Sequence, residues 1–257
     1  MINEPLFTIV TVVHNDAPNI EKTILNVLGQ RNTTLEYIII DGGSWDGTRQ
    51  TIEKYKDRLA AYLSEPDHGI YHAMNKGVLL ARGEWIIFMN SGDTFVTETI
   101  LSEISKQLPT EPAVFYGDYI ADYGEKGQRI IRAGIKRALY KMVLSHQSVV
   151  SHSSLVIDHP FDETLKISSD LDFYFKCENA GAPFVYFPKV ISVRKAEGIS
   201  DLNRMDSIKE SYAVSKKHQP SIWVDVFFAR IKATTLIKSF FKSMMPDYFQ
   251  ALFRNNI

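Results

Sequence analysis

The sequence is short of cysteine, of net charge and of long apolar runs, and each shortage excludes a class of protein. Cys177 is the only cysteine among 257 residues, which excludes an intrachain disulfide and fits a reducing compartment. The formal net charge of -1 leaves no basic excess to neutralise a nucleic-acid backbone, so a dedicated nucleic-acid binder is not expected. No apolar run approaches the roughly 20 residues that a membrane-spanning helix needs, and residues 1–5 do not resemble a signal peptide. These features together predict a cytoplasmic protein.

The stretch 85–95 combines a buried strand with a polar turn. Residues 85–89 are continuously apolar, which is typical of a strand covered on both faces in a parallel sheet. The strand ends at Asn90, Ser91, Gly92 and Asp93, where Gly92 permits a sharp turn. Open α/β sheets bind ligands at the carboxyl ends of their strands, and a carboxylate there can hold a divalent cation together with phosphate. In the alternative interpretation, Asp93 only forms the turn.

Strand and helix signals alternate along the first half of the chain. Apolar runs predict further buried strands at 6–13, 37–40 and 61–64. Helical spacing predicts helices at 19–28, with Asn19 as the N-cap, from 46 onward, and at 70–81, where Gly77 would allow close approach to the sheet. Successive β-α units predict a parallel sheet with right-handed crossovers. Farther along, the composition predicts a helix at 98–107, a strand at 114–118, a hairpin at 119–132, and β-structure at 149–157, 184–187 and 190–193.

Several polar residues allow a functional and a structural interpretation. The glycines of DGGSWDGT do not match the spacing of a dinucleotide-binding loop. Asp41, at the end of the second strand, either accepts hydrogen bonds from a nucleotide base or ribose, or organises the turn. Lys76 either neutralises phosphate charge or is a solvated helix lysine. Asp170 precedes an apolar helical segment, where it is either a general base at the positive helix end or a capping acid. Asp172 is expected to be a structural acid and is the next candidate for the base.

Seven stretches together resemble family 2 glycosyltransferases, which have the nucleotide-sugar-binding GT-A fold. Their order and spacing over about residues 6 to 200 carry the resemblance more than any one motif. The similarity extends to exopolysaccharide enzymes of the colanic-acid type, which have NSGD and SHQ stretches. The matching stretches are TIVTVVHN (8–15), EYIIIDGGSWDGT (36–48), SEPDHGIYHAMNKG (64–77), GEWIIFMNSGDTF (83–95), SHQS (145–148), SSDLDFYFK (168–176) and EGIS (197–200).

The resemblance implies an α/β fold and a division of the chain. A Rossmann-like, mostly parallel central sheet flanked by helices would form a catalytic domain over residues 1–219. Residues 220–257 would form an amphipathic helical tail. The boundary is placed near Gln219 and Pro220, after which the composition changes.

The resemblance also implies a role for each motif position. Asp170 resembles the catalytic base and Asp93 the residue that holds Mg²⁺ or Mn²⁺. Asn90 replaces the first acid of the family's D-x-D motif, and Ser169 replaces the Glu of its E-D pair, so each pair retains one acid. The acceptor or phosphate side would include His146, Gln147 and Ser200, although His146 could equally be a structural hydrogen-bonding residue. Nucleotide and donor-sugar contacts are expected at Thr11, Val13, Asn15, Asp41, Asp67, Asn75, Lys76, Asn90 and Ser91.

The function implied by the resemblance is inverting transfer of a sugar from a nucleotide-diphosphate sugar to a hydroxyl of a lipid-linked saccharide, in surface polysaccharide synthesis. The incomplete metal motif motivates one alternative, an assembly subunit that binds nucleotide-sugar without turnover. A sugar nucleotidyltransferase is the other, but the residues after the first strand lack the glycine-rich, basic loop that such enzymes use.

The tail has an apolar stripe beside basic residues. After position 229 the basic residues outnumber the single acid, Asp247. The basic residues are Arg230, Lys232, Lys238, Lys242 and Arg254. This pattern predicts an interfacial helix on an anionic membrane, which would place the protein peripherally on the cytoplasmic face. The alternative is packing against the catalytic domain or against a second subunit in a homodimer. The stripe comprises Ile237, Phe240, Phe241, Met244, Tyr248 and Leu252, interrupted by Pro246.

Overall fold

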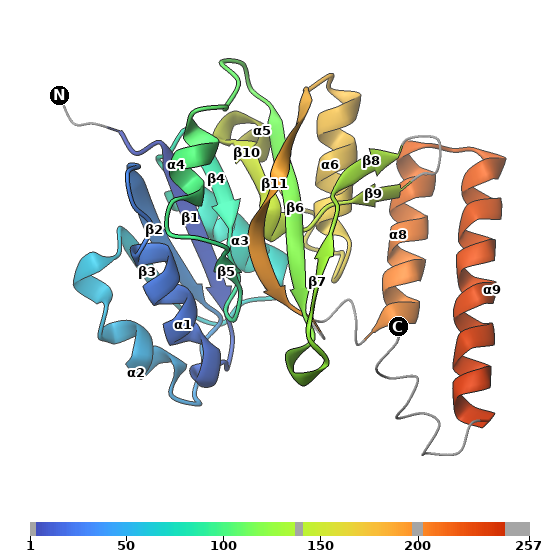
Figure 1. Ribbon diagram of the computed structural model, residues 1–257, viewed down its shortest axis with the longest axis horizontal. Helices are drawn as coiled ribbons and strands as arrows, with labels where there is room; N and C mark the ends of the chain where they lie inside the picture. Colours follow the sequence, from blue (N-terminus) through green and yellow to red (C-terminus); the bar gives the residue numbers. More distant parts are fainter. Residues whose placement is uncertain (1–3, 137–140, 197–202, 245–257) are drawn as a thin grey trace.

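Four parallel strands form the first half of the central sheet in the computed structural model, which describes residues 4–136, 141–196 and 203–244. Strands β1 (Phe7–Val13), β2 (Leu35–Asp41), β3 (Ala61–Ser64) and β4 (Trp85–Phe88) lie in the order β3-β2-β1-β4. Helices α1 (Ala17–Leu28), α2 (Thr48–Glu53) and α3 (Ile70–Leu80) connect them (Figure 1). Every residue of β1 and β4 is buried, which confirms the prediction of strands covered on both faces.

The second half of the sheet is mixed. Strand β10 (Val149–His152) runs antiparallel to β4 and to β6 (Val114–Asp122), whereas β11 (Phe184–Lys195) runs parallel to β6. The short β5 (Thr94–Phe95) pairs antiparallel with β11, and β7 (Gln128–Ile131) closes the predicted hairpin on β6. A separate two-stranded ribbon joins β8 (Gly134–Lys136) and β9 (Lys141–Val143). The carboxyl end of β4 therefore lies beside a strand of opposite direction, which bounds the ligand-binding edge.

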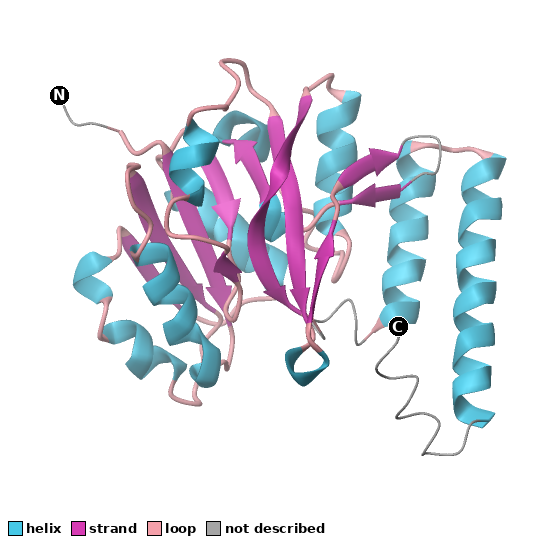
Figure 2. Cartoon of the chain, in the orientation of Figure 1, coloured by secondary structure: helices cyan, strands magenta, loops and turns pink. Residues whose placement is uncertain are grey.

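Helices cover both faces of the sheet (Figure 2). One apolar layer packs α1 and α4 (Ile100–Ser105) against the sheet, and the other packs α3, α5 (Ser153–Asp158) and α6 (Ser169–Asn179). Gly77 of α3 lies against β1 so closely that a Cβ atom there would collide with Val10, as expected from the sequence. The close approach brings the start of α3 to the ligand-binding edge of the sheet.

Two predicted boundaries were wrong. The first helix begins at Ala17, not after Asn19, because Pro18 fits the first helical turn and Asp16 takes the N-cap position. The predicted β-structure at 149–157 ends at His152, where the chain turns into α5. The ring of His152 accepts a hydrogen bond from the backbone N–H of Ser154 at 3.3 Å, which caps that helix. The apolar residues after Ser153 belong to a helix face, which composition alone does not distinguish from a strand.

Helix α8 (Arg204–His218) docks on α6 through a buried ion cluster. Asp172 of α6 has no exposed surface and lies 2.8 Å from Lys176, 3.0 Å from Lys217 and 2.8 Å from His218. Burial would raise the pKa of Asp172, but hydrogen bonds from Lys176, His218 and Lys217 outweigh it and lower the pKa to about 2. Asp172 is therefore the structural acid that the sequence predicted.

Helix α9 (Ile222–Met244) packs alongside α8, away from the sheet (Figure 1). Val224 and Phe228 are buried, and Asp225 accepts hydrogen bonds from Tyr212 and Lys216 of α8. None of the helices within the described ranges has the length and apolarity to cross a membrane. The part of the predicted stripe beyond Met244 lies outside the described residues. Exposed apolar side chains of α9 are Ile222, Trp223, Val226, Leu236 and Ile237.

The Asp172 cluster predicts a pH-dependent contribution to stability. Because the folded-state pKa lies below the ordinary value of 3.8, the stabilisation is present above pH 4 and disappears as the pH falls towards 2. Asp172→Asn should lower the free energy of unfolding by roughly 2 kcal/mol at pH 7 and by about 1 kcal/mol at pH 3. Urea denaturation at both pH values measures this difference. Asp206→Asn, in an exposed pair with Lys209, is the control and should change stability by less than about 0.5 kcal/mol.

Candidate active site

A cavity of about 510 Å³ opens at the carboxyl end of β4. The loop after β4, the turn at 145–148, the end of β11 and the start of α6 converge on it, and α8 contributes one wall. The lining contains carboxylates, amides, basic groups and apolar side chains. The lining includes Asp16, Asn19, Ile70, Tyr71, Asn90, Ser91, Asp93, Tyr119, Leu144, Ser145, His146, Gln147, Lys166, Ile167, Ser168, Asp170, Leu171, Tyr174, Arg194, Lys195, Ala196, Ser207 and Ser211.

Asp93 presents a buried carboxylate to this cavity. The turn before it depends on Gly92, whose φ of 90° is in the left-handed region that favours glycine. Only 6% of Asp93 is exposed, and its carboxylate accepts hydrogen bonds from Gln147 Nε2 at 2.6 Å and from the Lys195 backbone N–H at 2.9 Å. Burial raises the pKa of this carboxyl, and the two donors oppose that rise. A cation bound nearby would favour the ionised form.

Asn90 and Ser91 also line the cavity, as predicted. The side-chain Nδ2 of Asn90 donates to His146 Nε2 at 2.8 Å, whereas its buried Oδ1 has no hydrogen-bond partner among the described residues. Ser91 Oγ donates to Asp16 Oδ2 at 2.7 Å. Asn90 therefore offers an oxygen for a ligand, and Ser91 joins the loop after β4 to the start of α1.

Asp170 lies in the first turn of α6 and faces His146. Its Oδ2 is 3.7 Å from His146 Nδ1, and its Oδ1 accepts from the Leu171 N–H at 2.8 Å and from the Tyr71 hydroxyl at 3.4 Å. Since Asn90 donates to His146 Nε2, the proton of a neutral imidazole is on Nδ1, towards Asp170. Burial and the nearby Asp170 carboxylate raise the pKa of Tyr71 well above its ordinary value, so Tyr71 remains a donor. The N-terminal end of α6, the imidazole and the phenol therefore all lie beside the Asp170 carboxylate.

The turn at 145–148 connects the two carboxylates. His146 contacts Asn90 and Asp170, and the next residue, Gln147, contacts Asp93. Ser145 Oγ donates to Gln147 Oε1 at 2.5 Å, which orients the amide so that its Nε2 faces Asp93. Adjacent side chains of one short turn therefore set the placement of both acids.

Seven of the nine expected nucleotide and donor-sugar contacts do not line this cavity in the described part of the chain, and Thr11 and Asp41 are two of them. Thr11 is completely buried, and its hydroxyl bonds to Tyr37 at 2.9 Å and to the Met89 carbonyl at 2.7 Å. Asp41 is also buried and accepts from the backbone and hydroxyl of Ser44 and from Ser64 at 2.6 Å. These bonds match the turn-organising alternative for Asp41.

The remaining donor-side residues have protein partners of their own. Val13 is buried at the end of β1, and the side chain of Asn15 accepts from the Trp45 N–H at 3.0 Å. Asp67 accepts from the Gly69 N–H at 3.0 Å, which organises the loop before α3. Asn75 bonds to both backbone groups of Phe161 and to Glu163, and Lys76 forms a 2.7 Å ion pair with Glu65. None of these residues lines the cavity in the part of the chain that is described.

Two further positions concern the family motifs. Ser169, which stands where the family has Glu, is completely buried, so this position does not face the cavity. Ser200 lies outside the described residues. The sequence therefore predicted Asp93, Asn90, Ser91, Asp170, His146 and Gln147 as cavity residues, and the structure brings these six together.

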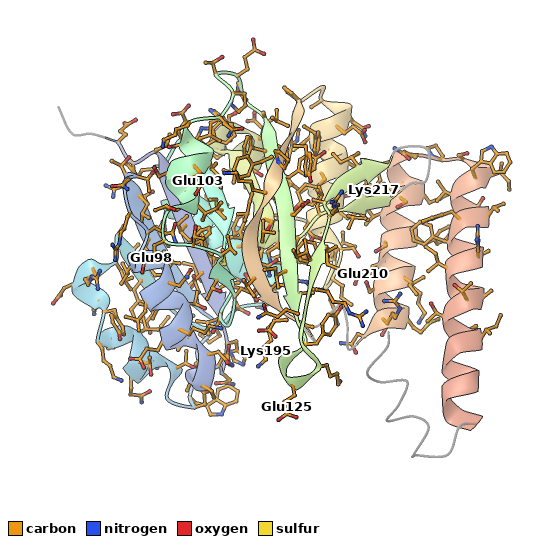
Figure 3. The ribbon with its side chains drawn as sticks, viewed as in Figure 1. Glu98, Glu103, Glu125, Lys195, Glu210 and Lys217 are labelled. Carbon is orange, nitrogen blue, oxygen red and sulfur yellow. The ribbon has the colours of Figure 1, made fainter. Side chains whose placement is uncertain are left out.

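Sequence reasoning missed several residues of the cavity. Asp16 follows β1 within the stretch His14–Pro18 and could have been found as another polar residue at a strand end. Arg194 and Lys195 are at the end of β11, where basic residues could also have been noted (Figure 3 labels Lys195). Ser207 and Ser211 come from α8, and no local pattern connects that helix to the site.

Comparison with known proteins gives the geometry a family context. An uncharacterized glycosyltransferase of Mycobacterium tuberculosis is 28% identical over 183 residues, which cover 68% of this chain and 70% of the relative. A PGL/p-HBAD biosynthesis glycosyltransferase of Mycobacterium bovis is 26% identical over 182 residues, covering 67% of this chain and 70% of its own length. TuaG of Bacillus subtilis, named for teichuronic acid biosynthesis, is 28% identical over 119 residues, 45% of this chain and 47% of TuaG.

Two solved structures share the fold. Residues 1–349 of Staphylococcus aureus TarS, in complex with UDP-GlcNAc, superpose with a TM-score of 0.62 at 20% identity, covering 81% of this chain and 64% of that one. This chain spans only 38% of the longer TarS chain. The mannosyltransferase PcManGT of Pyrobaculum calidifontis, in complex with GDP-Man and Mn²⁺, gives a TM-score of 0.64 at 16% identity, covering 98% of this chain and 79% of PcManGT. Both likenesses establish the GT-A fold.

The family model of glycosyl transferase family 2 matches residues 8–157, from the start of β1 almost to the end of α5. The match spans more than half of the chain and contains the loop after β4 and the turn at 145–148. With the GT-A sheet and the paired acids of the cavity, it shows that this chain belongs to glycosyl transferase family 2.

Proposed function

We propose that the chain is an inverting glycosyltransferase that moves a sugar from a nucleotide-diphosphate sugar to a hydroxyl of a saccharide acceptor. The observation that carries the proposal is the convergence of Asp93 and Asp170 on one cavity through adjacent residues of the turn at 145–148. The two acids serve different tasks in such a reaction. Asp93 would hold a cation that stabilises the departing diphosphate, and Asp170 accepts the proton of the attacking hydroxyl.

The donor class is supported by the bound ligands of structural neighbours. TarS was solved with UDP-GlcNAc and PcManGT with GDP-Man, both of which are nucleotide-diphosphate sugars. In this chain, Arg194 and Lys195 add positive charge to the cavity that contains Asp93. Basic side chains and a cation are what a diphosphate requires as it leaves.

The residues around Asp93 fit a divalent cation such as Mg²⁺ or Mn²⁺. These ions prefer oxygen ligands, and the loop after β4 offers the Asp93 carboxylate and the unpartnered Oδ1 of Asn90. Within the described ranges no group of three or more His, Cys, Asp or Glu side chains is placed so that it could hold a metal ion, so diphosphate and water oxygens would complete the coordination. When bound, the cation supplies Lewis-acid stabilisation of the leaving diphosphate.

Asp170 acts as the general base in this proposal. The acceptor oxygen forms a bond to the anomeric carbon while the bond from that carbon to the diphosphate oxygen breaks, and the hydroxyl proton passes to Asp170. The electron pair of the broken bond leaves with the nucleoside diphosphate. Attack from the face opposite the diphosphate inverts the anomeric configuration. His146 and Tyr71 hold the Asp170 carboxylate in place during the step.

The acceptor would occupy the part of the cavity beside Asp170. Tyr71, Tyr174 and Leu171 provide aromatic and apolar surface there, and Ser207 and Ser211 provide hydroxyl groups. Such a surface suits a saccharide, which presents C–H faces and hydroxyls. TuaG is named for teichuronic acid biosynthesis and the Mycobacterium bovis relative for PGL/p-HBAD biosynthesis, and by analogy we place the acceptor in surface polysaccharide synthesis, linked to lipid.

The exposed face of α9 would hold the enzyme on the membrane that carries such an acceptor. Trp223 is 66% exposed and Ile237 is 54% exposed, and Arg230 and Lys232 are exposed on the same helix. Apolar side chains beside basic ones suit an interfacial helix on anionic lipid, with roughly 1 kcal/mol of attraction per basic residue near the surface. The protein would be peripheral, on the cytoplasmic face where nucleotide-sugars are available.

The first test of the function is Asp170→Asn. A panel of nucleotide-sugars with Mn²⁺ identifies the donor by thermal shift, since a true donor stabilises the folded protein by mass action. The variant should bind that donor as the wild type does, while transfer or donor hydrolysis falls by at least ~100-fold, the usual contribution of a positioned base. Undiminished turnover would show that Asp170 is not the base.

The metal assignment is tested with Asp93→Ala. The variant should lose the Mn²⁺-dependent part of donor binding, measured by calorimetry with and without chelator. Asn90→Asp restores a second carboxylate and should tighten the metal. If neither chelator nor Asp93→Ala changes the turnover rate, the assignment of Asp93 as a metal ligand is wrong. Basic side chains would then have to stabilise the diphosphate.

The membrane proposal is tested by flotation with anionic liposomes at low salt. The full chain should float, whereas Trp223→Ser/Ile237→Ser and a chain ending at Gln219 should stay in the bottom fraction. Flotation should be weaker with neutral liposomes, which offer the basic residues no anionic headgroups. It should also be weaker at high salt, which screens the attraction between the basic residues and anionic lipid. If the double variant floats as well as the wild type, the apolar face of α9 is not a membrane anchor.

A further inference from the structure

Glu210 of α8 binds the segment that leads into the catalytic helix. Its Oε1 accepts a hydrogen bond from the Lys166 backbone N–H at 3.0 Å, and its Oε2 accepts from Ile167 at 2.8 Å and Ser168 at 3.0 Å. Figure 3 shows Glu210 on the side of α8 that faces the rest of the protein. Three consecutive backbone groups are therefore satisfied by one carboxylate that comes from more than 40 residues later in the chain.

The same segment has little support of its own. Ser168 takes the N-cap position of α6 but makes no side-chain capping bond, and its hydroxyl instead bonds to Ser211 of α8 at 3.0 Å. Buried backbone N–H groups must be paired, and bonds to a carboxylate are about twice as strong as neutral ones. Glu210 thus supplies, from another helix, the acceptors for the backbone N–H groups of the segment that leads into α6.

Tyr71 links the same segment to Asp170. The Ile167 carbonyl accepts from the Tyr71 hydroxyl at 2.7 Å, and that hydroxyl also reaches Asp170 Oδ1 at 3.4 Å. The backbone at 166–168 is consequently held between Glu210 and Tyr71, two residues before Asp170. A shift of this segment would move Asp170 relative to His146 and to the acceptor hydroxyl.

We infer that Glu210 is a positioning residue for Asp170, and that α8 is a working part of the active site. The inference rests on the proposed role of Asp170 as the base. A displacement of about 1 Å at a reacting group can cost on the order of 100-fold in rate, so a clamp at this point has a measurable effect. Glu210 touches no substrate atom in this account and acts through the backbone.

Glu210→Gln tests the inference, because it keeps the shape but turns an NH₂ group towards backbone donors. Hydrogen–deuterium exchange at 166–168 should become faster. The turnover assay measures release of nucleoside diphosphate from UDP-GlcNAc, GDP-mannose or the donor found by thermal shift. In this assay kcat should fall at least ~10-fold, whereas the KM for the donor should change less than ~2-fold. Glu210→Asp keeps a carboxylate and should recover part of the lost turnover.

Lys217→Met is the matched control on the same helix. It removes one contact of α8 with Asp172, which keeps Lys176 and His218. The variant should lower the melting temperature while leaving both kcat and exchange at 166–168 as in the wild type.

Two results would overturn the inference. The first is that Glu210→Gln has the kcat of the wild type although exchange at 166–168 is faster. The second is that Lys217→Met loses as much kcat as Glu210→Gln, which would indicate a general effect of the docking of α8. Asp170→Asn belongs in the same assay. If it turns over donor like the wild type, the proposed function fails, whatever Glu210 does.

Discussion

The hydrogen bond from Gln147 to Asp93 is the interaction on which the cavity depends. It joins the loop that follows β4, in the parallel half of the sheet, to the turn that precedes β10, in the mixed half. Asp93 is only 6% exposed, so an ionised carboxylate there costs free energy of desolvation. The hydrogen bonds from Gln147 and from the Lys195 backbone N–H offset part of that cost. The same turn places His146 near Asp170, so Asp93 and Asp170 share one support.

The surroundings of Asp170 are built differently from those of Asp93. Asp93 and Asn90 stand on loops at strand ends, whose positions follow from the sheet. Asp170 stands on a helix whose N-terminal segment lacks a local cap and is held by α8 through Glu210 and Ser211. The buried cluster at Asp172 fixes the other end of the contact between α6 and α8. Asp170 is therefore positioned largely by contacts that are distant in the sequence.

This difference explains how much could be predicted from the sequence. The strands at 7–13, 35–41 and 85–88 and their polar ends follow from apolar runs that stop at turn residues, and they led to Asp93, Asn90 and Ser91. Family resemblance added Asp170, His146 and Gln147. The resemblance could not show that the side chains of Thr11 and Asp41 form hydrogen bonds inside the protein, because these bonds depend on which residues the sheet brings close. Glu210 looks like any helix surface acid, since its partners lie 42 to 44 residues earlier.

The clamp at Glu210 has a consequence for the order in which the protein is made. Synthesis runs from the N-terminus, so the strands and loops that carry Asp93 and the turn at 145–148 leave the ribosome well before α8 does. A nascent chain that has reached residue 180 already contains Asp170 but lacks the carboxylate that holds the backbone before it. The surroundings of Asp170, the proposed base, would thus be completed only after α8 has been synthesised.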